Sequence, residues 1–156
     1  MRMTDTDDIP DIFRESVAKN RKTEADIIAQ KAAAAISELT DQYLLQVHQD
    51  LRTLKQALQK ARQSTPDTYF AIIRDTFFLK MHDMKGQGAT FGYPLLTEIG
   101  GYACDYLRYK KEITPQDLDK LAQLVNDIDR VLSETPTDTG GKIEDEIRSH
   151  LTDLTS

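Results

Sequence analysis

The chain has 156 residues, of which 39% are apolar, and its 26 acidic and 20 basic side chains give a formal net charge of −6. This length suits a single domain with one core, and the negative charge argues against non-specific nucleic-acid binding, which depends on neutralising phosphates. There is no apolar run of roughly 18 residues to span a membrane, no secretory signal in the acidic N-terminus and only one cysteine, so we expect a cytoplasmic protein.

Glycine and proline are distributed unevenly along the chain. There are seven glycines and five prolines, and no glycine precedes Gly86. An all-β protein would need turn residues every 8–12 positions or so throughout. The distribution therefore predicts helices separated by prolines, with one glycine-rich patch between Gly86 and Gly101.

The first two segments lie before the prolines that open the later helices. Residues 1–23 are mostly polar and predict a flexible or short helical segment. Residues 24–62 are strongly helical in pattern, and Thr40-Asp41 could start a second helix, so one helix and two in line both remain open. One apolar stripe with steps of three and four runs through Ile36, Leu39, Tyr43, Val47, Leu51, Leu54 and Leu58.

Prolines mark the starts of the following helices. Thr65-Pro66 and Thr114-Pro115 each combine an N-cap residue with a proline suited to the first helical turn. We expect helices over 66–91, 94–111, 115–134 and, after a turn-rich connector, 142–154.

Helices joined by short links favour antiparallel neighbours. The fold prediction is therefore all-α. It is an antiparallel up-down four-helix bundle over 24–134, with an extra N-terminal helical segment (1–23) and a linker with a short C-terminal amphipathic helix (135–156).

The stretch from Phe77 to Gly92 combines a histidine with unusual glycines. On a helical wheel, the apolar stripe of this helix lies opposite His82, which predicts that His82 points to solvent. Gly86 and Ala89 fall on the His82 face, and Phe78 and Leu79 bracket the histidine as a candidate docking patch. Gly86 in a helix costs about 1 kcal/mol relative to alanine, which indicates a need for close approach by a partner.

We interpret three further features of the sequence as structural: Lys80, Gly88 and the pair Gly100-Gly101. The wheel places Lys80 at the edge of the apolar stripe, with its stem on apolar surface and its ammonium in water. Gly88 falls on the core side, and Gly100 with Gly101 would let two helices approach.

The pattern His82-x-x-Lys85-Gly86, with Gly92 at the tenth position after the histidine, resembles the signature of histidine-containing phosphotransfer (Hpt) domains. These are four-helix bundles that relay phosphoryl groups in bacterial two-component signalling. The resemblance covers roughly residues 40–134. It implies that His82 accepts the phosphoryl group, that Lys85 stabilises it, and that Gly86 gives clearance to the partner. Gln87 stands where the family often has a small residue.

The same resemblance implies the partners. They would be response-regulator receiver domains and a (hybrid) histidine kinase, with Mg²⁺ supplied by the receiver and no cofactor or metal bound by this chain. The protein would be a stand-alone phosphohistidine carrier in a phosphorelay rather than a kinase, and we expect a monomer rather than an oligomer. We expect neither nucleic acid nor membrane as a partner.

Two other functions remain open. The bundle could bind a receiver or kinase without accepting phosphate, or it could be an unrelated adaptor that acts through its tail, residues 142–154. The other histidines are widely separated from Cys104, so no metal-ligand cluster is predicted. We expect His48 on the surface, His150 without a role, and Cys104 as a small core residue.

Overall fold

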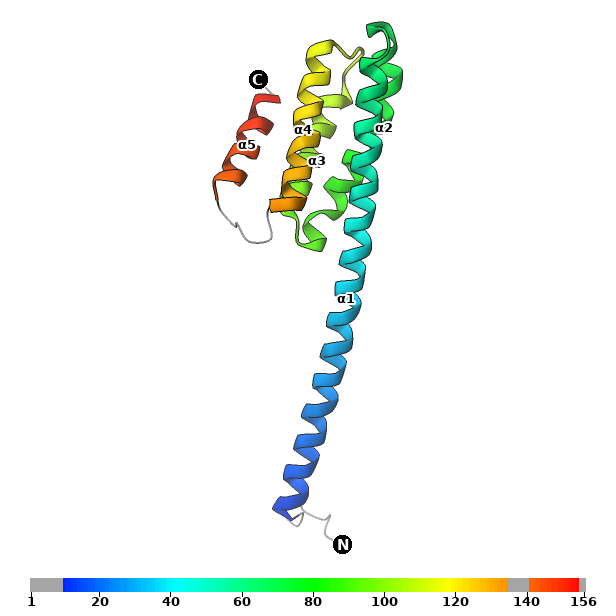
Figure 1. Cartoon of the computed structure of the whole chain (residues 1–156). Coiled ribbons are helices and arrows are strands. Elements are labelled where there is room, and N and C mark those ends of the chain that lie inside the picture. Colours follow the sequence, from blue (N-terminus) through cyan, green and yellow to red (C-terminus); the bar gives the residue numbers. More distant parts are fainter. Residues whose placement is uncertain (1–9, 135–140, 155–156) are drawn as a thin grey trace. The chain divides into compact units, whose positions relative to one another are not determined.

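In a computed structural model, residues 10–134 and 141–154 are described, and all their regular elements are helices. The α-helices are α1 (Asp11–Arg62), α2 (Tyr69–Gln87), α3 (Pro94–Arg108), α4 (Pro115–Glu134) and α5 (Lys142–Leu154) (Figure 1). Two short 3₁₀ helices, η2 (Pro66–Thr68) and η3 (Ala89–Phe91), flank α2. The prediction of an all-helical chain is confirmed for these residues, and α4 and the C-terminal helix have the predicted bounds.

The chain divides into two compact units, Met1–Gln42 and Tyr43–Ser156. The described part of the first unit is the N-terminal part of α1, which runs without a break from Asp11. Residues 24–62 therefore belong to one helix, which also includes residues 11–23. From Pro10 to Leu39 every residue is exposed, including Ile36 and Leu39 of the apolar stripe.

The second unit contains the hydrophobic core. The part of α1 in this unit contributes the rest of the stripe, from Tyr43 to Leu58, together with Ala61, and Leu54 is fully buried. The amphipathic helices α3 and α4 bury apolar faces in the same core, and α3 packs against both α2 and α4. The shorter α5 packs on α3 and α4 through Ile147, Leu151 and Leu154 (Figure 1).

Ion pairs join the second unit's part of α1 to α4. Lys55 Nζ lies 3.1 Å from Asp129 Oδ2, and Arg62 Nη2 lies 3.5 Å from Asp119 Oδ1. These four side chains are largely exposed. Pairs of this kind contribute roughly 0–1 kcal/mol each, so burial of the apolar stripe, rather than surface charge, holds α1 in the core.

The two Thr-Pro sequences start their helices differently. Thr114 and Asp117 form a reciprocal cap at α4: the Thr114 N–H donates to Asp117 Oδ2 (2.8 Å), and the Asp117 N–H donates to Thr114 Oγ1 (3.1 Å). Lys110 and Tyr106 also donate to the Asp117 carboxylate. Thr65 makes no such cap, and Pro66 opens the single turn η2 before α2 begins at Tyr69.

The predicted helix over 66–91 is interrupted at its C-terminal end. The α-helix stops at Gln87, and Gly88 caps it by donating its N–H to the Met84 carbonyl. A 3₁₀ turn follows and ends at Gly92, whose φ of 87° is the left-handed conformation that favours glycine. The Gly92 N–H donates to the Ala89 carbonyl and the Tyr93 N–H to the Gly88 carbonyl, which closes the turn. Gly88 itself lies against α3, because a Cβ built there would lie 2.8 Å from the Thr97 nitrogen.

Candidate functional site

One face of α2 presents the predicted site residues. His82 is exposed, as the wheel predicts, and its ring stacks on Phe78 with centroids 6.3 Å apart and an interplanar angle of 24°. Phe78 is partly buried against the core, and the Arg74 guanidinium lies 5.3 Å above its ring. The imidazole is therefore accessible while one side of it rests on an aromatic ring that the core holds in place.

Lys85 and Gly86 lie one turn after the histidine, still within α2. Lys85 is exposed, and a Cβ built on Gly86 would meet no atom within 4 Å. Leu79, which lies about one turn before His82, has 58% of its surface exposed. The face therefore combines an imidazole, an ammonium, an apolar side chain and a bare stretch of backbone.

The opposite side of the same turn rests directly on α3. A Cβ on Gly100 would lie 2.5 Å from both the Met81 carbonyl oxygen and the Lys85 nitrogen. Only a hydrogen atom fits in that space, so the two backbones touch at the level of His82. The packing interpretation is thus correct for Gly100. It is wrong for Gly101, where no atom lies within 4 Å of a built Cβ.

Ala89 is exposed, but it belongs to η3 and not to α2. The prediction that Ala89 lies on the His82 face requires the α-helix to continue through residue 89. Because α2 ends at Gln87, that prediction does not apply. Its N–H donates to Thr97 Oγ1 at 2.8 Å, which ties the end of the His82 helix to the first turn of α3.

The Lys80 ammonium pairs with a buried carboxylate, whereas we expected it in water. Its Nζ lies 2.9 Å from Oδ1 of Asp50, a buried carboxylate of α1 that also accepts a hydrogen bond from Gln46 Nε2 (2.9 Å). Burial, with the charge of Asp50 as a further cause, raises the pKa of Tyr43 to about 12. The pairing requires α1 and α2 to be packed, and no local pattern around Lys80 indicates it.

Cys104 is a buried core residue, as expected, and it lies behind the site. Its Sγ is 3.9 Å from the Phe78 carbonyl oxygen, which is within range of a weak S–H donor. Burial raises the pKa of the thiol, and the nearby charges of Lys85 and Arg108 oppose that shift only in part. A thiol in this environment is a packing group rather than a nucleophile.

The other two histidines have different surroundings. His48 is exposed on α1. His150 is half-buried and its Nδ1 lies 3.0 and 3.1 Å from the two carboxylate oxygens of Asp127, which is fully buried in α4. Burial raises the pKa of Asp127, although hydrogen bonds from His150 and Gln123 act in the opposite direction. His150 thus helps to hold α5 on α4, a structural role that the sequence reading missed.

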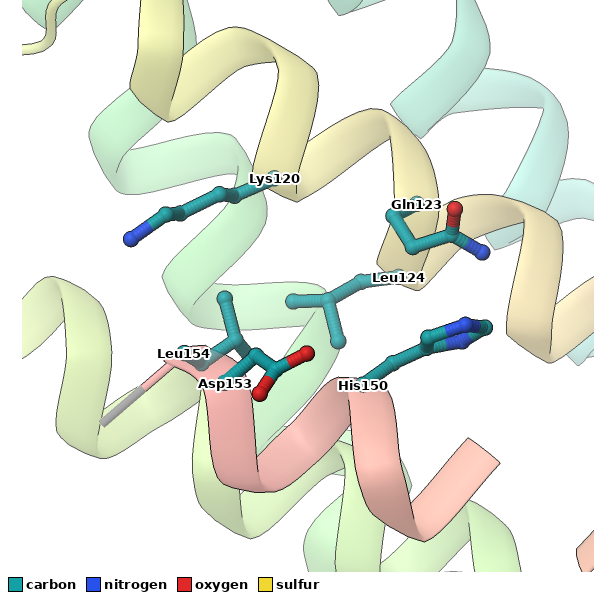
Figure 2. Close-up of a pocket in the computed structure, with 6 residues that line it drawn as sticks. All are labelled: Lys120, Gln123, Leu124, His150, Asp153 and Leu154. Carbon is teal, nitrogen blue, oxygen red and sulfur yellow. The ribbon is translucent and has the colours of Figure 1, made fainter. Parts of the chain in front are cut away.

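A pocket lies between α4 and α5 beside that pair (Figure 2). Its volume is near 110 Å³, and His150 and Asp153 face Lys120, Gln123 and Leu124 across it. It is much smaller than the roughly 300 Å³ at which pockets for organic ligands begin. It therefore does not compete with the α2 face as the candidate site.

Among residues 10–134 and 141–154, no group of three or more His, Cys, Asp or Glu side chains could hold a metal ion. The helices of this part of the chain include none that is long and apolar enough to cross a membrane. Comparison with family models, with curated proteins and with solved structures finds no match to this chain. The geometry of the α2 face therefore has to carry the functional argument.

Proposed function

We propose that this protein is a histidine phosphotransfer protein, in which His82 carries a phosphoryl group between the aspartates of receiver domains. The observation that carries the proposal is the exposed imidazole of His82 one turn before Gly86, where the surface is open and the backbone beneath rests on α3. An exposed nucleophile on a rigid helix beside a bare strip of backbone is what docking of a second protein's active site requires.

The chemistry uses the imidazole as a nucleophile. A neutral imidazole has a lone pair on one ring nitrogen and a proton on the other, and it is available near pH 7. The free nitrogen attacks phosphorus in line as the P–O bond to the receiver aspartate breaks, and the aspartate leaves as a carboxylate. The phosphorylated ring keeps its proton, and transfer to a second receiver's carboxylate regenerates the neutral imidazole.

The remaining groups of the site stabilise charge and geometry. Phosphoryl transfer depends mainly on positioning and on electrostatic stabilisation of the equatorial oxygens. Lys85, one turn from His82 and exposed, supplies a positive charge there. The receiver domain contributes Mg²⁺ and its own acidic residues. Stacking on Phe78 restricts the orientations of the ring before the partner arrives.

The packing of the second unit supports the fold that this function implies. The part of α1 from Tyr43 onward, together with α2, α3 and α4, shares one core, and short links join consecutive helices. We assign these four segments to an antiparallel up-down bundle of the phosphotransfer type. The helix α5 then adds a fifth element, which packs on α3 and α4.

A binding module that accepts no phosphate is the second candidate, and exposed Leu79 favours it. A large apolar side chain at 58% exposure beside the histidine suits protein docking whether or not the imidazole reacts. The two candidates share one surface and differ in whether His82 is modified. A labelling experiment separates them.

The test is phosphorylation of the full chain by radiolabelled phospho-receiver domains, prepared with a hybrid histidine kinase and ATP, and separately by phosphoramidate. We expect an acid-labile, base-stable phosphate that is lost in His82→Gln. The matched control is His48→Gln, because His48 is also an exposed helical histidine. Equal labelling of wild type and His82→Gln would contradict the proposal, and receiver binding without any labelling would favour the binding module.

A further inference from the structure

Arg74, Phe78 and His82 form a row along α2. They follow one another at steps of four residues, and side chains at that spacing are neighbours on one side of a helix. The Arg74 Cζ lies 5.3 Å from the centroid of the Phe78 ring, and the centroids of the Phe78 and His82 rings are 6.3 Å apart. The phenyl ring is therefore the middle member of the row, in contact with the guanidinium on one side and the imidazole on the other.

Arg74 occupies its place at a cost. Its Nε is buried and has no hydrogen-bond partner within the part of the chain that the structure describes. A buried N–H without a partner is unfavourable and rare in native proteins. Arg74 Nη1 donates to Asp75 Oδ1 at 3.0 Å, but the Asp75 side chain is 89% exposed, and such a pair contributes little. The contact that accounts for the position of Arg74 is the one with the Phe78 ring, a cation over an aromatic face within about 6 Å.

The row restricts a side chain that is otherwise free to move. His82 is exposed, and exposed side chains change rotamer in picoseconds to nanoseconds unless a neighbour holds them. Its ring stacks on Phe78 at an interplanar angle of 24°. Phe78 in turn is partly buried against the core and has the Arg74 guanidinium over its face. The orientation of the imidazole therefore depends on how firmly Arg74 and the core hold the phenyl ring.

We propose that Arg74 is a positioning residue for phosphoryl transfer and that it acts on His82 through Phe78. The guanidinium fixes the phenyl ring, and the phenyl ring holds the imidazole in an orientation from which a ring nitrogen attacks phosphorus in line. This proposal rests on the proposed function of His82. In-line attack requires the nucleophile to be aligned with the breaking P–O bond, so a ring that is already oriented reaches the reactive geometry more often.

Direct contact between Arg74 and the receiver domain is the alternative, and the two roles predict different kinetics. A positioning residue changes the maximal rate of transfer and leaves the receiver concentration at half-maximal rate unchanged, whereas a residue that binds the receiver changes that concentration. The buried Nε and the 31% exposure of the Arg74 side chain favour the positioning role, because much of the guanidinium is covered before any partner arrives.

The test measures transfer from a phosphorylated receiver domain to the full chain as a function of receiver concentration. We expect the maximal rate to fall about tenfold in Phe78→Leu and about threefold in Arg74→Met, with the half-maximal concentration unchanged in both. Phe78→Tyr keeps the aromatic face and should retain most of the wild-type rate. The matched control is Arg62→Met, which removes an exposed arginine that pairs with Asp119 of α4 and should transfer at the wild-type rate.

A double-mutant cycle determines whether Arg74 acts through Phe78. If it does, Arg74→Met has no further effect on the maximal rate in a Phe78→Leu background. A full threefold loss in that background would overturn the proposal. So would a raised half-maximal concentration in Arg74→Met, because Arg74 would then belong to the surface that binds the receiver.

Failure of this proposal is distinguishable from failure of the proposed function. A wild-type chain that is not labelled at His82 would overturn both. Labelling that is lost in His82→Gln but proceeds at the wild-type rate in Arg74→Met and Phe78→Leu would overturn the positioning role alone. The NMR signals of the His82 ring protons, assigned by their loss in His82→Gln, give a readout that needs no phosphate. They should shift in Arg74→Met as well as in Phe78→Leu, and signals unchanged in Arg74→Met would overturn the proposal.

Discussion

The two faces of α2 differ in burial and in the space around their glycine contacts. On one face Phe77, Met81 and Met84 are buried, and the backbone touches α3 at Gly100 so closely that no Cβ fits between them. On the other face His82 and its neighbours Lys85 and Gly86 are exposed, and Gly86 has open space where Gly100 has none. Glycine therefore stands in this short region both where no Cβ fits, at Gly100, and where a Cβ would meet open space, at Gly86.

Gly100→Ala should have the largest effect on stability. The added methyl group would lie 2.5 Å from the backbone at Met81 and Lys85, which cannot move aside as a flexible side chain would. Overpacking of this kind costs about 3 kcal/mol or more, so we expect the free energy of unfolding in urea to fall by that amount. A loss below about 0.5 kcal/mol would contradict the direct contact between α2 and α3. The neighbouring Gly101→Ala, at a site with open space, is the matched control and should not destabilise.

Lys80→Met should have the next largest effect. It removes the ammonium 2.9 Å from the buried Asp50 carboxylate and leaves that charge with the Gln46 hydrogen bond alone. An uncompensated buried charge costs several kcal/mol, and because the Lys80 side chain retains 25% exposure we expect about 2 kcal/mol of lost stability.

The comparison for Lys80→Met is Lys85→Met, on the open face of the same helix. It should leave the free energy of unfolding within about 0.5 kcal/mol of wild type. If both substitutions destabilise equally, the two faces do not differ in the way described. Under the proposed function, Lys85→Met should instead slow phosphoryl transfer to His82.

Gly86→Ala should have the smallest effect on stability and the opposite sign. No atom obstructs a Cβ there, and alanine is the better helix former by about 1 kcal/mol in a helix interior. Because Gly86 is in the last turn of α2, we expect thermal unfolding to show a gain of about 0.5 kcal/mol. Destabilisation would show that something occupies this space, while slower phosphoryl transfer without loss of stability would support the clearance role.

Much of the fold could be predicted from the sequence because its signals are local. Pro94, Thr114-Pro115 and the apolar spacing of 142–154 each mark the start or the buried face of one helix, and these elements appear where expected. The exposure of His82 follows from the same wheel that places Phe77 and Met84 in the core. The end of α2 at Gln87 was not read in this way, because the wheel continues a regular helix to residue 91, whereas a 3₁₀ turn from Ala89 to Phe91 follows and ends at Gly92.

The stripe on α1 shows where local pattern is insufficient. Ile36 and Leu39 belong to the same apolar stripe as Val47 and Leu54, yet the first pair is exposed and the second pair is buried. Periodicity identifies the face that can be buried, whereas burial requires that other helices reach that face. Among the described residues of the stripe, burial begins at Tyr43.

The sequence by itself determined that the described chain is helical, where most of the helices begin, and that His82, Lys85 and Gly86 share one helix. Each of these properties depends on residues within a few turns of one another. Only the tertiary structure decided that Lys80 pairs with Asp50, that His150 pairs with Asp127, and that Gly100 rather than Gly101 makes the close contact. Each of these contacts depends on which helices pack together and on their relative positions along their axes. The free energy that holds the helices in these positions comes from burying side chains that are distant in sequence.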